Sequence, residues 1–175
     1  MSLFFPIAKG DPSLERITMA HGAGGTIMHD LIKKYIVTHL GGSGAEVPLE
    51  ALDDAAVIGD IVLKSDSHAV KPIFFPGGDI GRLAVAGTVN DIAVMGAEPV
   101  ALSCGFVLEE GLKITDFEKI LESMKQTCKE TGVYVITGDT KVVEKGNLGG
   151  CVINTSGIGK RNSALERNIA EVKKH

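Results

Sequence analysis

The chain has 175 residues, a length typical of one domain with a substantial core but not of two well-developed ones. Its 18 basic and 22 acidic residues give a net charge of −4, and no basic block stands out, which disfavours nucleic-acid binding. Hydrophobic residues make up 44% of the chain, yet no stretch reaches the roughly 18–20 uncharged apolar residues of a membrane helix, and the N-terminus lacks a secretory pattern. We therefore expect a cytoplasmic protein without a membrane segment.

The cysteine and glycine content limits the kind of site. Cys104, Cys128 and Cys151 lie far apart without a Cys-x-x-Cys spacing, so we expect buried free thiols and no disulfide framework or zinc site. Glycine accounts for 22 residues, well above average usage, and the glycines cluster beside acidic residues. Functional residues are expected in these segments.

The first predicted element is a helix over residues 26–40. Apolar residues recur there at helical spacing, Thr26 is the expected cap, and Gly41 and Gly42 end the pattern.

A tight hairpin is predicted next, from apolar segments 55–58 and 61–63 on either side of a Gly-X turn. Asp53 and Asp54 precede the first strand, and Asp66 follows the second. Because a hairpin folds back on itself, these carboxylates are expected to lie close together.

The central region predicts a buried helix over 79–95, a strand over 100–107 and a second helix over 115–131. Thr115 and Glu118 have the spacing of a capping box at the start of the second helix. Its buried face is expected to hold four residues, Phe117, Leu121, Met124 and Cys128.

The last predicted elements are a strand over 133–137 and a hairpin that pairs 142–143 with 151–155. Beyond Gly159 the sequence becomes charged and amphipathic. We therefore divide the chain into a domain over 1–159 and a C-terminal helix or tail over 160–175.

The strongest chemical signal is Asn90-Asp91 in the middle of an apolar helix. A buried, unpaired carboxylate costs several kcal/mol, so buried charges are generally paired or bound to metals. An exposed stripe, or a hydrogen bond to a neighbouring loop, is the structural alternative.

Four further acidic sites, one of them a pair, lie at the ends of predicted elements: Asp53-Asp54, Asp66, Asp79 and Asp139. Each alone is more typical of a cap or turn residue. Together, their oxygen ligands suit a hard cation that also binds phosphate, and Mg²⁺ fits better than zinc.

Two glycine-rich loops, at 21–25 and 76–78, precede predicted helices and offer backbone N–H groups that can approach a phosphate. Both are equally compatible with ordinary turns. Lys141 is a candidate phosphate ligand or a solvated edge residue, and His21 is a loop histidine of interest. The sequence contains no P-loop motif, no dinucleotide-binding Gly-x-Gly-x-x-Gly motif after a strand and no Gly-x-Ser-x-Gly motif.

Five segments together resemble the HypE family of hydrogenase expression/formation proteins, within the aminoimidazole ribonucleotide synthetase-like superfamily. They are AHGAGG (20–25), DDAAV (53–57), FFPGGDIG (74–81), GTVNDIAVMGA (87–97) and TGDTKVV (137–143). The resemblance runs in order from about Ile17 to Gly159.

This resemblance implies an α+β, PurM N-terminal-like domain, with a mixed sheet backed by helices that dimerises through a shared β-barrel and binds ATP and Mg²⁺. The implied catalytic residues are Asp91 and Lys141. The implied nucleotide ligands are His21, Gly22, Gly24, Gly25, Asn90, Asp139 and Thr140. The implied metal ligands are Asp53, Asp54, Asp66, Asp91 and Asp139.

The family reaction is an ATP-dependent dehydration of a carbamoylated C-terminal cysteine to a thiocyanate during [NiFe]-hydrogenase maturation. The implied partners are a second copy, a carbamoyl-transferring maturation protein and other maturation factors. Family members continue into a second domain that ends in cysteine, whereas this chain ends in His175, so we expect an N-terminal half. Whether it acts as an enzyme is left open. A docking module without catalysis and a small-molecule kinase of the thiamine-phosphate type are the alternatives.

Overall fold

The computed structural model describes residues 16–42 and 44–162, which fall into two compact units divided after Gly42. Each unit is described by itself. The predicted tail over 160–175 lies outside the described residues from position 163 onward, and its first two residues belong to a strand that ends at Arg161.

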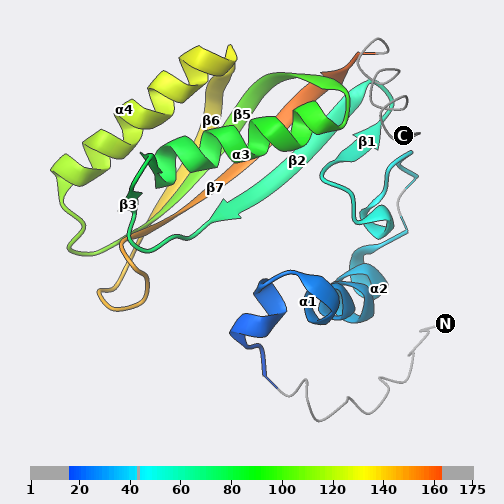
Figure 1. Ribbon diagram of the computed structural model, residues 1–175, viewed down its shortest axis with the longest axis horizontal. Helices are drawn as coiled ribbons and strands as arrows, with labels where there is room; N and C mark the ends of the chain where they lie inside the picture. The colour runs from blue at the N-terminus through cyan, green and yellow to red at the C-terminus, as the bar shows by residue number, and fades with distance from the viewer. Residues whose placement is uncertain (1–15, 43, 163–175) are drawn as a thin grey trace. The chain divides into compact units, whose positions relative to one another are not determined.

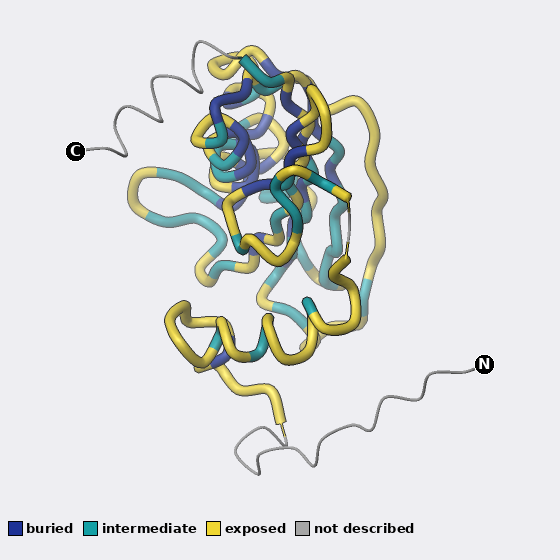
Figure 2. The backbone as a smooth tube through the Cα atoms, turned by 90° about the vertical axis from the view of Figure 1, so that its right-hand side faces the viewer, coloured by how far each residue is buried: buried dark blue, intermediate teal, exposed yellow. Residues whose placement is uncertain are grey.

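The first unit is one continuous helix preceded by a short turn (Figure 1). The turn is η2 (Met19–Gly22), and the helix consists of α1 (Gly25–Leu31), the π-helical η3 (Ile32–Val37) and α2 (Thr38–Leu40). This confirms the predicted helix. The predicted cap at Thr26 is wrong, because Gly24 occupies the N-cap position with φ 80°, which glycine adopts without steric cost. Most of the described backbone of this unit is exposed (Figure 2). Among its described residues, His21 alone is buried.

The second unit is a mixed five-stranded sheet with two helices on one face (Figure 1). The strand order is β1-β2-β7-β5-β6, and every neighbouring pair is antiparallel except β5 and β6, which are parallel. This arrangement confirms the α+β class predicted from the sequence. The bounds are η4 (Leu49–Ala51), β1 (Ala56–Ile58), β2 (Ile61–His68), β3 (Phe74–Phe75), β4 (Gly78–Asp79), α3 (Ile80–Val94), β5 (Ala97–Glu109), α4 (Ile114–Thr131), β6 (Tyr134–Val143) and β7 (Cys151–Arg161).

Helix α3 forms the centre of the core because it contacts β2, β5, β7 and α4. Its first turn is capped by Asp79, whose carboxylate accepts hydrogen bonds from the N–H groups of Gly81 (2.7 Å) and Arg82 (3.1 Å). The helix has apolar residues on several sides because it is buried between α4 and the sheet. The main core cluster includes Ile80, Val85, Leu102, Ile120, Met124 and Ile153.

The other face of the sheet is not covered by any described element of this unit (Figure 1). Alternate residues of β2 and β7 point to that side, and the large apolar side chains there are exposed. Ile61, Leu63 and Ile158 are 52%, 49% and 41% exposed.

The structure confirms the hairpin of β1 and β2 and the helices α3 and α4, but corrects two details of α4. The helix begins at Ile114 with Lys113 as N-cap, and no side chain caps it, so the predicted capping box is wrong. Its buried residues are Ile120, Met124 and Thr127. Of the predicted face, Cys128 is half-buried and Leu121 is exposed, so the buried stripe is rotated toward α3 and the sheet.

The predicted hairpin of residues 142–143 with 151–155 is also wrong. Strand β6 is continuous over Tyr134–Val143 and pairs in parallel with β5, while β7 inserts between β5 and β2. The long β5 offers β7 an extended antiparallel ladder, which stabilises more than pairing with the two-residue segment. The connecting loop is held by Glu109, whose carboxylate accepts hydrogen bonds from three backbone N–H groups, those of Gly146, Leu148 and Gly150.

Candidate functional site

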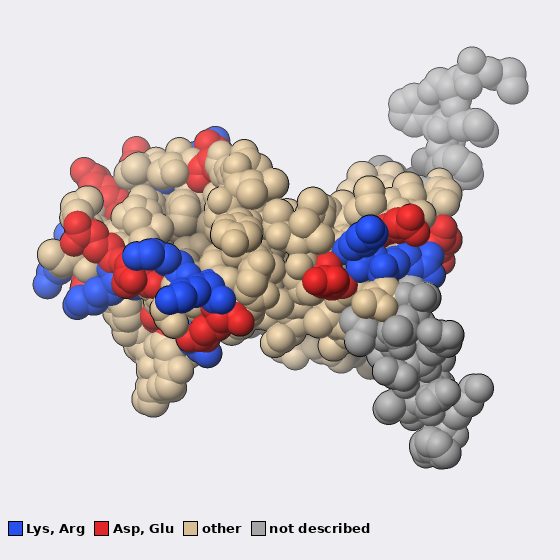
Figure 3. Space-filling model, turned by 90° about the horizontal axis from the view of Figure 1, so that it is seen from above, with Lys and Arg blue, Asp and Glu red and all other residues tan. Residues whose placement is uncertain are grey.

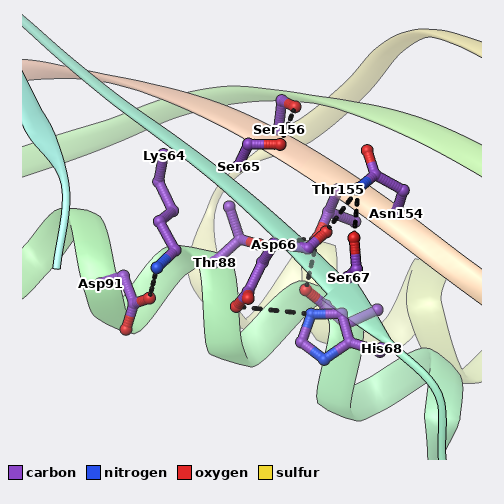
Figure 4. A network of polar contacts seen from close by, with 11 residues as sticks. Lys64, Ser65, Asp66, Ser67, His68, Thr88, Asp91, Asn154, Thr155 and Ser156 are labelled. Atoms are coloured by element: carbon purple, nitrogen blue, oxygen red, sulfur yellow. Dashed lines mark hydrogen bonds and ion pairs between the residues drawn. The ribbon is translucent and has the colours of Figure 1, made fainter. Parts of the chain in front are cut away.

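A row of polar side chains on β2 faces α3 and forms a charged cluster with it. Lys64, Asp66 and His68 are alternate residues of the strand, so they point to the same side of the sheet (Figure 4). Across from them on α3 are Gly87 and Asp91, one helical turn apart. The β2 ladder and the apolar contacts of α3 therefore place charged groups in the space between these two elements.

Asp91 forms an ion pair with Lys64 in this space. The Lys64 Nζ lies 2.5 Å from Asp91 Oδ2, and the two side chains are 19% and 27% exposed (Figure 4). The sequence predicted that a carboxylate at this position needs a partner, and the structure supplies one from β2. The neighbouring Asn90 is exposed.

Asp66 lies beside His68, whose Nε2 is 3.6 Å from Asp66 Oδ2 (Figure 4). This exceeds a normal hydrogen-bond length, and the buried Nε2 has no hydrogen-bond partner among the described residues. Burial lowers the pKa of His68, and the carboxylates of Asp66 and Asp91 oppose that shift. The ring is therefore neutral near pH 7.

Gly87 permits the close approach of α3 to this row. A Cβ on Gly87 would lie 3.0 Å from His68 Cε1 and 3.5 Å from Asp66 Oδ2. Without a side chain, the helix backbone packs directly on the imidazole ring and the carboxylate.

A buried hydrogen-bond chain fixes α3 to the sheet beside this cluster. Thr155 of β7 donates to the carbonyl oxygen of Ala84 at 3.2 Å, and the hydroxyls of Thr155 and Thr88 are 2.6 Å apart (Figure 4). With Thr155 donating to Ala84, Thr88 is the donor to Thr155, so both buried hydroxyls are satisfied.

Asp53 and Asp54 lie in the exposed segment before β1. The N–H of Asp54 donates to the carboxylate of Asp53 at 3.0 Å, an arrangement typical of a turn. The β1–β2 ladder extends as far as the pair Ala56 and Leu63. These two residues stay predicted metal ligands.

Asp139, Thr140 and Lys141 lie on β6, at the edge of the sheet, and all three are exposed. Lys141 Nζ donates to Asp139 Oδ2 at 2.8 Å. This hydrogen bond lowers the pKa of Asp139 and raises the pKa of Lys141. The pair is preformed and open to solvent.

Within one chain, Asp66 and Asp139 lie on opposite faces of the sheet. Asp66 pairs with the buried Thr155, on the side of the helices, whereas Asp139 is opposite Gly105, which pairs with Asn154 on the open side. Two strands, β7 and β5, also separate their strands, which corresponds to roughly 14 Å. The five predicted metal ligands are thus not gathered around one point in the described part of a single chain.

Asp66 and Asp91 nevertheless fit a magnesium ion that is shared with a substrate. Residues 16–42 and 44–162 contain no group of three or more His, Cys, Asp and Glu side chains arranged to bind a metal. Mg²⁺, however, commonly binds one or two carboxylates and completes its octahedron with water and substrate phosphates. Two carboxylates that flank the same space suit that mode and do not suit a cage built from protein alone.

An apolar groove of about 1080 Å³ lies between α4 and the strands β5 and β6, and the sequence did not predict it. Tyr134, Val135 and Ile136 form much of its wall, and Asp139 and Thr140 also line it. None of Asp53, Asp54, Asp66 or Asp91 lines the groove, so it is separate from the β2–α3 cluster.

The predicted thiols are confirmed as free and shielded. Cys104 and Cys151 are buried and Cys128 is half-buried, and none is bonded. Burial raises the pKa of all three, that of Cys104 to about 11, so they are poor nucleophiles.

The glycine-rich loop at His21 belongs to the first unit. The His21 Nδ1 accepts a hydrogen bond from the N–H of Thr18 at 3.0 Å, and the buried Nε2 has no partner among the described residues. Gly24 and Gly25 have φ of 80° and 76°, so the turn into α1 requires glycine. Together with Gly22, these residues stay predicted nucleotide ligands.

Sequence reasoning missed Lys64 and His68. A usable signal was present, because Lys64, Asp66 and His68 alternate directly after the predicted strand 61–63, which would extend that strand with one polar face. A strand whose inward positions are charged needs partners on the element that covers it.

Known proteins match this chain over most of its length. The family AIR synthase related protein, N-terminal domain, matches residues 52–160. A hydrogenase expression/formation protein of Methanocaldococcus jannaschii is 53% identical over 154 residues, which cover 82% of this chain and 44% of that protein. The carbamoyl dehydratase HypE of Escherichia coli is 42% identical over 161 residues, 89% of this chain and 47% of the relative. The chain thus spans less than half the length of these curated relatives.

Solved structures give the same assignment. A HypE–HypF complex matches with a TM-score of 0.71 and 47% identity, over 76% of this chain and 43% of that chain. A HypE structure in complex with ATP matches with a TM-score of 0.59 and 45% identity, over 83% of this chain and 43% of that chain. This chain therefore belongs to the AIR synthase related N-terminal domain family and resembles its HypE members, which confirms the resemblance seen in the sequence motifs.

Proposed function

We propose that this chain is the ATP-binding portion of a carbamoyl dehydratase that acts in [NiFe]-hydrogenase maturation. The observation that carries the proposal is the pair of carboxylates, Asp66 and Asp91, that flank one space between β2 and α3 beside Lys64. It is supported by 45% identity to a HypE protein solved with ATP.

The reaction proposed for the whole protein converts a carbamoylated cysteine to a thiocyanate. The carboxamide oxygen attacks the γ-phosphorus of ATP and ADP leaves, which turns a poor leaving group into a phosphate ester. One N–H proton is lost as the oxygen is phosphorylated. The C–O bond then breaks, phosphate leaves, and loss of the second N–H proton completes the nitrile.

In this proposal Asp66 and Asp91 hold Mg²⁺, which neutralises charge on the transferred phosphoryl group. Asn90, next to Asp91 on α3, is exposed and is a proposed nucleotide ligand. The remaining proposed nucleotide ligands are Asp139, Thr140 and Lys141 on β6, with His21, Gly22, Gly24 and Gly25 in the first unit. Asp53 and Asp54 complete the proposed metal ligands.

We further propose a homodimer formed through the uncovered sheet face. That face has exposed Leu63 and Ile158 side by side in the β2–β7 ladder, and a second sheet packed on it would remove both from water. On that face the hydroxyl of Ser156 already donates a hydrogen bond to that of Ser65, at 3.0 Å. Two such sheets face to face would form a barrel-like interface.

The proposed partner in maturation is a HypF-type carbamoyl-transferring protein, since a similar HypE has been solved in complex with HypF. We place the reaction in the cytoplasm. No helix among the described residues is long and apolar enough to cross a membrane. Basic and acidic side chains alternate on the face shown in Figure 3, so that face has no uniformly basic surface for a nucleic acid.

Calorimetric titration of ATP, with and without Mg²⁺, tests the proposal without requiring turnover. We expect the wild-type chain to bind ATP in a Mg²⁺-dependent manner. In Asp91→Asn, the gain in ATP affinity that Mg²⁺ provides should be at least about tenfold smaller than in wild type, because a metal ligand is removed.

Asp116→Asn is the matched control. Asp116 is a helical aspartate paired with a lysine, as Asp91 is, but it lies on α4, away from β2, and its substitution should leave ATP binding unchanged. Circular dichroism of both variants would show whether they fold. If the wild-type chain binds no ATP, the nucleotide-binding proposal fails for this chain and a docking role remains.

A further inference from the structure

The ion pair between Lys64 and Asp91 has consequences for how a metal reaches this carboxylate. Lys64 Nζ contacts Asp91 Oδ2 at 2.5 Å, and both side chains are mostly removed from solvent. An ammonium group held this closely occupies Oδ2, one of the two carboxylate oxygens, and its positive charge opposes a cation at the other oxygen. A metal ion that binds Asp91 through Oδ2 must therefore displace Lys64.

The local charge balance explains why the lysine is placed there. Asp66 and Asp91 contribute two negative charges to the space between β2 and α3, and Lys64 contributes one positive charge. Lys64 thus offsets half of a charge that would otherwise attract a divalent cation directly.

Once displaced, the lysine needs a new partner, because a half-buried ammonium without a counter-charge is costly. Water is a poor substitute at this depth. A nucleotide triphosphate that arrives with the metal brings several negative oxygens to the same space. The long, flexible lysine stem allows Nζ to move from carboxylate to phosphate without a backbone change.

We propose that Lys64 is an internal cation that competes with divalent metal for Asp91 and moves to a phosphate oxygen when nucleotide binds. Metal alone then binds weakly, and metal and nucleotide bind with positive coupling. This inference rests on the proposed ATP site. It makes Lys64 a positioning residue that decides when the metal binds.

The test measures Mn²⁺ binding in the absence of nucleotide, from the electron paramagnetic resonance signal of free Mn²⁺. Lys64→Met keeps an unbranched apolar stem and removes the charge. It should bind Mn²⁺ about tenfold more tightly than wild type or better, because a cation within a few ångströms no longer opposes the metal. Lys64→Gln, a second neutral variant, should do the same if the methionine variant folds poorly.

Lys119→Met is the matched control, since Lys119 is exposed and paired with Asp116 on α4. It should leave Mn²⁺ binding at the wild-type level. An unchanged Mn²⁺ affinity in both Lys64 variants would overturn the competition.

A second measurement uses the wild-type chain and tests the coupling. Mg²⁺ is titrated alone and in the presence of a non-hydrolysable ATP analogue. We expect at least about tenfold tighter Mg²⁺ binding with the analogue in wild type and a smaller ratio in Lys64→Met. Equal ratios in the two proteins would overturn the transfer of Lys64 to phosphate. If the analogue does not bind at all, the proposed ATP site fails, whereas the Mn²⁺ experiment still decides whether Lys64 competes with metal.

Discussion

The charged side chains of this chain differ most in how deeply their ion pairs are buried. Lys64 and Asp91 are 19% and 27% exposed, whereas Lys141 and Asp139 are 70% and 68% exposed. The exposed pair is screened by water and salt and contributes little to stability. In the half-buried pair, removing one partner leaves the other charge poorly solvated. The rearrangement that we propose therefore concerns the β2–α3 pair, in which the loss of a partner is the more costly.

Glu109 gives a pH-dependent prediction at the same scale. Hydrogen bonds from the N–H groups of Leu148, Gly146 and Gly150 hold the pKa of Glu109 below its ordinary value. A carboxylate with a depressed folded pKa stabilises the fold above its unfolded pKa and loses that contribution as the pH falls through the folded value. Glu109→Gln should therefore lower the unfolding temperature at about pH 7, and the difference from wild type should shrink toward about pH 3.

Thermal unfolding followed by circular dichroism across this pH range checks the prediction. Glu110→Gln is the control, because Glu110 is the exposed neighbour of Glu109 in sequence. A difference between Glu109→Gln and wild type that stays constant with pH would contradict a role for the charged carboxylate.

At the scale of elements, the docking of α3 on the sheet positions the candidate site. Strand β7 has glycine at two inward positions, 157 and 159, directly beneath Ile92. The missing side chains let the helix lie close to the sheet, and the Thr88–Thr155 hydrogen bond fixes its position along β7. That position in turn sets Asp91 opposite Lys64.

Gly157→Ala tests this close packing. A Cβ there would lie 2.6 Å from Ile92, 2.8 Å from Thr88 and 2.9 Å from Leu102, all fully buried side chains. Such overpacking costs about 1–3 kcal/mol of unfolding free energy, measurable by urea denaturation.

Gly105→Ala provides the comparison within the same sheet. Its nearest neighbouring atoms, in Asn154, are 3.8 Å from the added Cβ, so the change should cost less than about 1 kcal/mol. Equal destabilisation by the two substitutions would show that close helix–sheet contact is not the cause.

At the scale of the whole molecule, the second unit has one covered and one uncovered sheet face. A sheet normally buries one face at least, and here α3 and α4 serve that purpose. The opposite face has apolar residues at one end and a belt of hydroxyl and amide groups at its centre, including Ser65, Ser67, Asn154 and Ser156. Such a mixed surface is suited to pairing with a second sheet of the same kind.

Leu63→Lys tests the proposed dimer. Leu63 lies opposite Ile158 on the uncovered face, and in a symmetric interface a lysine there would bury one unpaired charge from each copy. We expect wild type to sediment as a dimer at micromolar concentration and the variant to shift toward monomer in analytical ultracentrifugation.

Ile114→Lys serves as the control, because this exposed residue begins α4, a helix on the covered side of the sheet. This substitution should leave the mass of the sedimenting species at the wild-type value. A wild-type chain that sediments as a monomer would contradict the dimer.

The helices and the β1–β2 hairpin were predictable because their signals are local. Apolar spacing defined α3 and α4, and the Gly59-Asp60 turn defined the hairpin. Within the site, the sequence identified Asp91 as a carboxylate that needs a partner. It did not identify the partner, because Lys64 is far away along the chain and reads as an ordinary strand lysine.

By itself, the sequence determined the main helices and the first hairpin from local spacing. The family, and through it the α+β class and the acidic residues of interest, came from motifs along the chain. The tertiary structure decided which strands pair, which face of each element is covered and which charges meet. Strand β7 pairs with β5 and β2 and not with the end of β6 that is nearby in sequence, because the long ladders stabilise the sheet more than a short local hairpin would. That pairing puts Asp66 on the helix side of the sheet and Asp139 on the open side, a distinction that depends on register across four strands.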